Sequence, residues 1–184
     1  IDMNVDIINY SSGGSGFSAE EKQAVERANK KGILIIAAAG NFNDDIDTKK
    51  GSYFPASYKS PNIISIINHD QHLNLHPTSN YGKTNADISA PGTKISSFLP
   101  NNRHGYLSGT SQATAFVTGV AAIIKANFPS IGHIKLKQIL LDSSKYTEKL
   151  SRKCFTQGAL DANSAFQKAY RMINQDFKRD IANY

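Results

Sequence analysis

Only one cysteine, Cys154, occurs in the 184-residue chain. A single cysteine excludes an intramolecular disulfide framework and a cysteine-rich zinc site, and we expect Cys154 to be a half-buried packing residue. Glycine and proline number 13 and 6, which excludes collagen-like and linker-dominated chains. The longest apolar runs, residues 33–39 and 117–124, are far shorter than the ~20 residues that cross a bilayer. The sequence therefore predicts a soluble domain with no membrane span.

What remains is the composition of a globular domain with uneven charge. Hydrophobic residues make up 40% and charged residues 20% of the chain, enough for one domain with a buried core. The net charge is +6, and residues 125–184 carry all of the excess, with eleven basic and five acidic side chains. Such a face can bind nucleic acid or anionic lipid. Because acidic residues are interspersed and no aromatic ladder accompanies the lysines, we favour a solvated helix surface and no nucleic-acid partner.

Short apolar segments alternate with helical patterns in the first half of the chain. The strand-like segments are residues 5–9, 33–39, 62–67 and 87–90. The second of them shows no polar alternation, which is typical of a strand covered on both faces. Before it, Ser18 and Glu21 match the S-x-x-E capping box, in which the serine accepts from a first-turn amide and the glutamate reaches back. Strands separated by helices favour an α/β domain with a parallel sheet.

The second half of the chain is predicted to contain a hairpin and three helices. Residues 95–99 and 104–108 flank the turn sequence PNN, and we expect them to form a hairpin beside the sheet. Helices are predicted from the GTS sequence at residues 109–111 to residue 128, and over residues 131–142 and 162–181.

Two motifs place a polar side chain next to a predicted element, one at the start of a helix and one after the end of a strand. In GTSQA (residues 109–113), Ser111 lies at a loop-to-helix junction, where free amides and the helix dipole favour developing negative charge. In AAAGN (residues 37–41), Asn41 follows the carboxyl end of an apolar strand, the edge at which open α/β sheets bind ligands. Taken alone, the first motif usually holds a capping serine and the second a turn asparagine.

Together and in this order, the motifs resemble those of the subtilisin-like serine proteases (subtilases), over roughly residues 1–170. VDIINYSSGG resembles the family's substrate-binding strand, AAAGN its oxyanion segment and YFPASY its pocket-forming loop. DISAPG resembles its inner strand and GTSQATAFVTG its nucleophile helix. The resemblance implies an open, mostly parallel sheet flanked by helices. It also implies that residues 1–184 are a partial catalytic domain lacking its N-terminal portion, with residues 160–184 as a C-terminal helix.

By this resemblance the chain belongs to a serine-type endopeptidase that works through an acyl-enzyme. Ser111 is the expected nucleophile, and Asn41 and the Ser111 amide are the expected oxyanion donors. A polypeptide substrate is expected to bind as an added strand. The expected substrate-binding residues are Ser11, Ser12, Gly13, Gly40, Phe42 and Tyr53. An aromatic side chain at position 53 would narrow the main specificity pocket and favour a small or medium P1 residue.

The general base that must activate the serine is absent from this pattern. The family supplies it from a histidine in H-G-T-H, oriented by an aspartate in D-T/S-G, and neither motif occurs here. We therefore expect both from a missing N-terminal part of the same catalytic domain. Because the truncated sheet would expose an apolar strand face, we expect either poor solubility or tight binding of that N-terminal part. In this family, loss of the base alone lowers kcat by about 10⁶-fold, nearly as much as loss of the whole triad. The isolated chain is expected to be nearly inactive.

None of the five histidines has the sequence context of that base. His69, His72 and His76 lie between two strand signals, where an exposed hairpin is favoured over a metal site. His104 lies in the hairpin before the GTS motif with no partner carboxylate evident, and His133 belongs to a late amphipathic helix.

The acidic loop at residues 43–47 is a candidate for calcium, which many subtilases bind. Its spacing lacks the D-x-D-x-D-G pattern and the distal glutamate, and Lys49 and Lys50 would repel a cation. We expect no metal ligands and no required cofactor, since calcium suits the residue types of this loop but not their spacing.

Two alternatives remain open. A catalytically inactive subtilase relative would use the groove as a peptide-binding module, and Ala115-Phe116-Val117 in place of the family's usual Pro-His-Val is consistent with it. An anion-binding module would act through the basic C-terminal helices. The compartment is unknown, and only the family resemblance suggests a secreted or cell-envelope protein.

Overall fold

Six strands form one sheet at the centre of the computed structural model, which describes residues 1–182, with side chains up to residue 175. The strands are β1 (Ile7–Tyr10), β2 (Leu34–Ala38), β3 (Ile63–His69), β4 (Ile88–Pro91), β7 (Lys145–Tyr146) and β8 (Gly158–Ala159). They lie in the order β1-β2-β3-β4-β8-β7, all parallel except β7. The predicted mostly parallel sheet is confirmed. Strands β7 and β8 have two residues each, too few to produce a sequence pattern.

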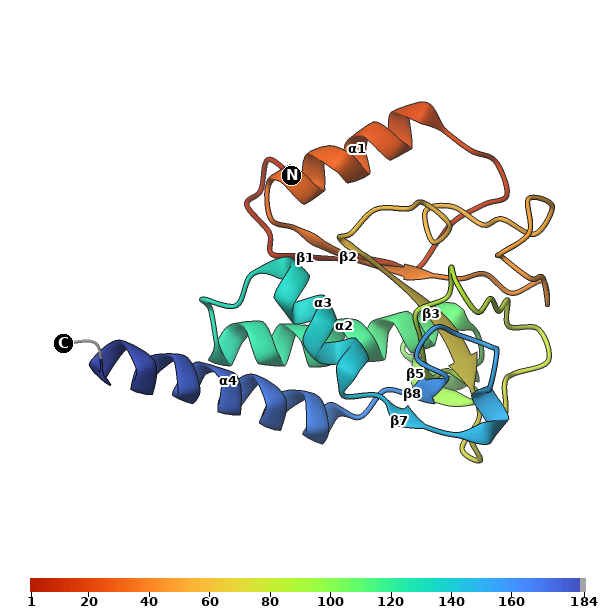
Figure 1. Ribbon diagram of the computed structural model, residues 1–184. Coiled ribbons are helices and arrows are strands. Elements are labelled where there is room, and N and C mark those ends of the chain that lie inside the picture. The colour runs from red at the N-terminus through yellow and green to blue at the C-terminus, as the bar shows by residue number, and fades with distance from the viewer. Residues whose placement is uncertain (183–184) are drawn as a thin grey trace.

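Helices cover both faces of this sheet, with α1 on one side and the other three on the opposite side (Figure 1). They are α1 (Ala19–Lys30), α2 (Thr110–Asn127), α3 (His133–Asp142) and α4 (Ala162–Ala182). Along β2, Leu34 and Ile36 belong to the core beneath α2, whereas Ile35 and Ala37 belong to the core beneath α1. Burial on both faces explains why this strand is apolar at every position. Within the described residues, no helix is both long and apolar enough to cross a membrane.

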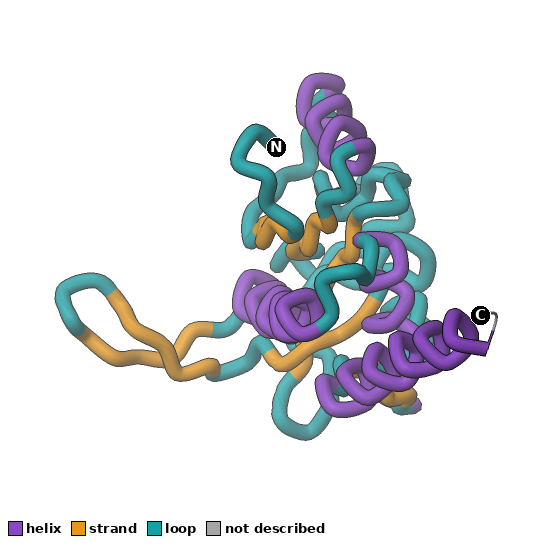
Figure 2. The backbone as a smooth tube through the Cα atoms, turned by 90° about the vertical axis from the view of Figure 1, so that its left-hand side faces the viewer, coloured by secondary structure: helices purple, strands orange, loops and turns teal. Residues whose placement is uncertain are grey.

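A hairpin stands apart from the central sheet. Strands β5 (Ile95–Leu99) and β6 (Arg103–Leu107) pair only with each other and project from the rest of the molecule (Figure 2). The predicted hairpin is therefore present with boundaries shifted by one residue, but it forms a sheet of its own. Its side chains Phe98 and Tyr106 are 81% and 74% exposed.

The start of α1 departs in one respect from the predicted capping box. Ser18 Oγ accepts a hydrogen bond from the backbone N–H of Glu21 at 3.1 Å, as expected. The Glu21 carboxylate does not return to the Ser18 amide; it accepts from the hydroxyls of Tyr10 and Tyr58, each at 2.8 Å. The bond to Glu21 raises the pKa of Tyr10 to about 12. This carboxylate thus ties the helix to the end of β1, a long-range contact that outweighs the local capping bond.

Two residues are more deeply buried than predicted. His69, expected in an exposed hairpin, is the last residue of β3 and only 4% exposed, with its Nδ1 2.6 Å from Ser89 Oγ. Burial lowers the pKa of His69 to about 4. Cys154, expected to be half-buried, is fully buried, and burial raises the pKa of its thiol. The tertiary contacts of the sheet, not the local sequence, enclose both side chains.

The burial of His69 predicts a loss of stability in mild acid. Its pKa is about 4 in the folded chain against an ordinary value of 6.5, so the unfolded chain takes up the proton first as pH falls. The stabilisation is complete above pH 6.5 and is lost between about pH 6.5 and 4, by roughly 3 kcal/mol. Urea unfolding across this range should show the loss in the parent chain. His69→Gln, which stays neutral, should flatten that part of the profile, and equal slopes for both proteins would contradict the assignment.

Candidate active site

The start of α2 meets the end of β1 at Ser111. Ser111 is the second residue of α2 and is partly buried. Its hydroxyl donates to the carbonyl oxygen of Ser11 at 3.0 Å, and the Ser11 hydroxyl donates back to the carbonyl of Ser111 at 3.1 Å. The N-cap residue of this helix, Gly109, has no side chain with which to cap its first amides. A reactive hydroxyl here would lie in the positive field of the helix end.

The Asn41 side chain reaches the same helix terminus from β2. Its Oδ1 accepts a hydrogen bond from the backbone N–H of Thr110 at 2.9 Å. A Cβ placed on Gly109 would lie 3.4 Å from Asn41 Nδ2, so the carboxamide lies directly over the Gly109–Thr110 backbone. With Oδ1 engaged by an amide, Nδ2 is the group left to donate to a new acceptor. The structure thus brings Ser111, Asn41 and Ser11 together, from segments 70 and 100 residues apart in the chain.

Gly40 permits this approach because its backbone is in the left-handed region, at φ +101°. A Cβ at this position would lie 2.4 Å from Asn80 Nδ2 and 3.0 Å from the ring of Tyr53. The Gly40 N–H donates to Thr110 Oγ1 at 3.2 Å, a second bond between this segment and α2. Glycine is therefore required here by both conformation and space.

The remaining predicted substrate-binding residues line the space beside Ser11. Gly13 and Ser12 lie on the exposed loop after β1. The ring of Tyr53 fills the space between this loop and Gly40, since a Cβ on Gly13 would lie 2.5 Å from Tyr53 Cε1. Phe42 is 69% exposed, with its ring centroid 6.1 Å from that of Tyr53. The Tyr53 ring therefore lies between the backbone of the loop after β1 and that of Gly40.

No histidine is hydrogen-bonded to Ser111 in residues 1–182. Four histidines bond elsewhere: His69 to Ser89, His72 to Gln71, His76 to Thr78 and His133 to Asn29. His104, which lies in β6, packs edge-on against Phe98 with 4.4 Å between ring centroids. The hydrogen bond from the Ser111 hydroxyl goes to a carbonyl, which is not a base.

Two carboxylates of the acidic loop after Asn41 accept hydrogen bonds from backbone amides. The Asp47 carboxylate accepts from the backbone N–H groups of Thr84 and Asn85, at distances from 2.7 to 3.1 Å. Asp45 Oδ1 accepts from the amide of Asp47 at 3.0 Å. These carboxylates cap loop amides, and within the described residues no group of three or more histidine, cysteine, aspartate or glutamate side chains could hold a metal ion.

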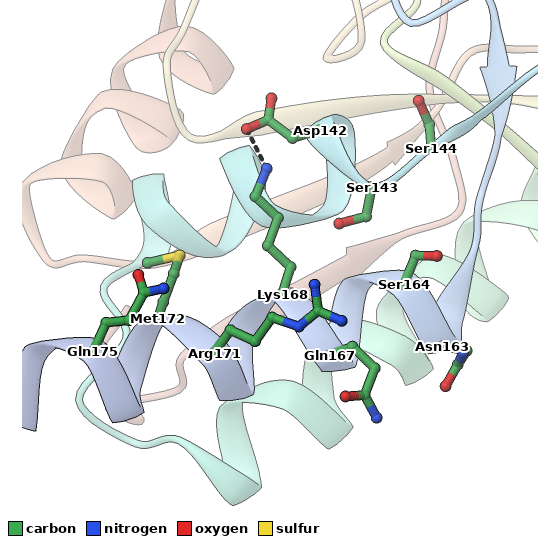
Figure 3. Close-up of a pocket in the computed structure, with 10 residues that line it drawn as sticks. All are labelled: Asp142, Ser143, Ser144, Asn163, Ser164, Gln167, Lys168, Arg171, Met172 and Gln175. Atoms are coloured by element: carbon green, nitrogen blue, oxygen red, sulfur yellow. Dashed lines mark hydrogen bonds and ion pairs between the residues drawn. The ribbon is translucent and has the colours of Figure 1, made fainter.

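A hollow of about 620 Å³ lies away from Ser111, between the end of α3 and one side of α4 (Figure 3). Its lining is polar, and its Lys168 forms an ion pair with Asp142 at 2.7 Å. Two further lysines of the basic C-terminal region are paired, Lys125 with Asp6 and Lys137 with Asp87. Part of the charge excess is therefore neutralised within the fold.

Comparison with known proteins assigns the family. The chain matches the Subtilase family (Peptidase_S8) over residues 1–170. It belongs to this family. One curated relative is the thermostable alkaline protease of Halalkalibacterium halodurans. This chain is 37% identical to it over 146 residues, which cover 79% of this chain and 38% of that protein. It is 38% identical over 126 residues to the major intracellular serine protease of Bacillus subtilis, covering 68% of this chain and 39% of that protein.

Solved subtilase structures have the same fold. A subtilase cytotoxin structure superimposes with a TM-score of 0.79 at 28% identity, covering 93% of this chain and 62% of that one. A protease of Pseudoalteromonas arctica superimposes with a TM-score of 0.78 at 28% identity, covering 90% and 51% of the two chains. The subtilase chain therefore spans about two fifths of the two curated relatives described above and one half to two thirds of these structures.

One residue of this subtilase site, Asn80, has no counterpart among the sequence predictions. It is 1% exposed, and its side chain bonds the backbone on both sides of Asn41. Its sequence context is a Ser-Asn pair in a polar loop, which is ordinary turn composition. No local pattern distinguishes it, because its partners lie about 40 residues earlier in the chain.

Proposed function

We propose that this subtilase chain supplies the nucleophile and the oxyanion donors of a serine endopeptidase. The observation that carries the proposal is the junction at the start of α2. There the Ser111 hydroxyl lies against the end of β1. Thr110, the residue before Ser111, donates its backbone N–H to Asn41 Oδ1 at 2.9 Å. The serine proteases among the curated relatives support the same chemistry.

Peptide-bond cleavage at this junction proceeds by acyl transfer. Ser111 Oγ bonds to the substrate carbonyl carbon while its proton passes to a general base, and the carbonyl oxygen becomes an oxyanion. Asn41 Nδ2 and the Ser111 backbone N–H donate to that oxygen. Collapse of the intermediate breaks the C–N bond, and the amine leaves with the proton returned by the base. Water activated by the same base then hydrolyses the acyl-enzyme and releases Ser111.

The general base and its orienting carboxylate are proposed to come from an N-terminal part of the same catalytic domain. Two surfaces along β1 and α2 support a further segment on this side of the sheet. Within residues 1–182, β1 pairs with β2 alone, so its outer edge has no strand partner there. The adjoining side of α2 exposes apolar side chains, with Phe116 at 45% and Ile123 at 56%. A hollow of about 440 Å³ lies between the start of β1 and the C-terminal end of α2, the end remote from Ser111, and is lined by Asp6, Ile7, Ala122, Lys125, Ala126 and Pro129.

A polypeptide substrate is proposed to bind in extended form beside the loop that follows β1. Ser11, Ser12 and Gly13 would offer backbone groups to the peptide, and Gly40 would border its P1 side chain. Tyr53 occupies the space between Gly13 and Gly40. We therefore propose a small or medium P1 residue.

The nucleophile assignment predicts labelling that depends on the missing part. The isolated 184-residue chain should show no peptidase turnover and little reaction with a fluorophosphonate, because nothing takes the serine proton. The longer protein that includes the N-terminal part should be labelled at Ser111, as located by mass spectrometry of the tryptic peptide.

Ser111→Ala in the longer protein should abolish labelling, whereas Ser108→Ala, which alters an exposed serine three residues earlier, should leave it intact. Brisk turnover by the isolated chain would contradict the account. A longer protein that binds peptides but neither cleaves them nor reacts with the probe would favour the alternative, a catalytically inactive peptide-binding subtilase.

The packing of Tyr53 predicts a change in P1 preference. Tyr53→Ala in the active protein should open the space between Gly13 and Gly40 and admit larger side chains. We expect the ratio of kcat/KM for P1 Phe to kcat/KM for P1 Ala to rise by about 10-fold or more, since each methylene that an apolar pocket accommodates is worth about 1–3 kcal/mol. The measurement is a set of peptide substrates that differ only at P1. Tyr146→Ala, on the opposite edge of the sheet, is the control, and an unchanged ratio in Tyr53→Ala would overturn the pocket assignment.

A further inference from the structure

We infer that Asn80 is the residue that positions Asn41 for oxyanion stabilisation. The inference rests on the proposed serine-protease function, and it concerns what holds the oxyanion donor in place. Asn80 has no contact with Ser111 and is almost completely buried, at 1% exposure. It is therefore a positioning residue that acts through Asn41 and does not touch the reacting atoms.

The segment around Asn41 needs such support because it has left the sheet. The last bond from β2 to β3 is donated by the backbone N–H of Ala39 to the carbonyl of Ile66 at 3.0 Å. Beyond this bond, the loop up to residue 44 bonds to residues 78–81 instead of to a strand of the sheet. The N–H of Asn43 donates to the carbonyl of Thr78 at 2.8 Å, and the carbonyl of Asp44 accepts from the N–H of Tyr81 at 3.0 Å. Buried main-chain groups without partners cost free energy comparable to a lost hydrogen bond.

Asn80 meets this need with one carboxamide and one backbone amide. It makes two bonds to the loop before Asn41 and two after it. Before Asn41, the Nδ2 of Asn80 donates to the carbonyl of Ala39 at 2.8 Å, and its backbone N–H donates to the carbonyl of Gly40 at 2.9 Å. After Asn41, its Oδ1 accepts from the N–H groups of Phe42 at 2.9 Å and Asp44 at 3.0 Å. Because these bonds bracket Asn41, they fix the loop on which its side chain stands.

Asn80 is itself fixed to the sheet. The hydroxyl of its neighbour Ser79, which is fully buried, donates to the carbonyl of Asn80 at 2.9 Å and accepts from the N–H of Asn68 in β3 at 3.0 Å. A continuous set of hydrogen bonds therefore runs from β3 through Ser79 and Asn80 to the loop that bears Asn41. Gly40 completes it, because any Cβ there would lie 2.4 Å from Asn80 Nδ2.

Oxyanion stabilisation is sensitive to such placement. Donors must lie about 2.7–3.1 Å from the developing oxyanion, and a misplacement of about 1 Å can cost 10²-fold in rate. Loss of Asn80 should therefore lower kcat, because the oxyanion forms only in the transition state, while leaving ground-state peptide binding nearly unchanged.

The chain offers a matched control in Asn62. It is also a fully buried asparagine, and its Nδ2 also donates to a carbonyl next to β2, that of Ile33 at 3.0 Å. Ile33 lies at the amino end of β2, whereas Asn41 lies beyond the carboxyl end. Substituting Asn62 therefore removes a comparable buried hydrogen-bonding group at the end of the sheet remote from Ser111.

The deciding experiment is a double-mutant cycle in the active, longer protein, with kcat and KM measured on a peptide p-nitroanilide. We expect Asn80→Ala to lower kcat by about 10–100-fold with KM changed less than about 3-fold, and Asn41→Ala to lower kcat by about 10²–10³-fold. In the Asn41→Ala background, Asn80→Ala should change kcat by less than about 3-fold, because its effect passes through a side chain already removed. Asn62→Ala should lower the melting temperature but leave kcat nearly unchanged in both backgrounds.

Other outcomes separate the failure of this inference from that of the proposed function. If Asn80→Ala lowers kcat by the same factor in both backgrounds, or changes only KM, Asn80 does not act through Asn41. Asn80→Ser, which keeps a small polar group, replaces Asn80→Ala in the same cycle if the alanine variant does not fold. Full activity of Ser111→Ala would instead overturn the proposed function itself.

Discussion

The candidate site depends on one hydrogen bond, from the backbone N–H of Thr110 to Asn41 Oδ1 at 2.9 Å. It fixes the carboxamide at the end of β2 against the first turn of α2, and it leaves Asn41 Nδ2 available for another acceptor. The Ser111 hydroxyl, one residue further along, is bonded to the end of β1. The parallel arrangement of β1 and β2 makes both contacts possible, because their carboxyl ends lie at one edge of the sheet.

The parts of this arrangement that the sequence predicts are those with a local cause. The apolar run that forms β2 and the GTS sequence that opens α2 are local signals, and they place Asn41 after the end of β2 and Ser111 at the start of α2. The roles expected of these two residues come from the family resemblance, not from the local patterns. The burial of His69 and the role of Asn80 depend on segments about 20–40 residues away, so no local pattern reveals them. At Glu21, long-range contacts outweigh a local one, since two distant tyrosine hydroxyls bond the carboxylate that was predicted to cap the helix.

Support of the loop and supply of the base come from different parts of the proposed enzyme. A buried set of bonds anchored in β3 holds the Asn41 loop, so in our proposal this chain preorganises the oxyanion donors. Proton transfer in our proposal needs a group brought to the open side of β1 and α2. Preorganised electrostatics without a base would make this chain a peptide-binding surface with very slow chemistry.

The central claim is that Ser111 and Asn41 act on the same carbonyl group. The most direct measurement is a crystal structure of the active, longer protein after reaction with a peptidyl phosphonate, whose phosphorus mimics the tetrahedral carbon. The account predicts a covalent bond from Ser111 Oγ to phosphorus, with a phosphonyl oxygen within about 3 Å of both Asn41 Nδ2 and the Ser111 amide. A phosphonyl oxygen directed away from Asn41, or an adduct on a different residue, would contradict it.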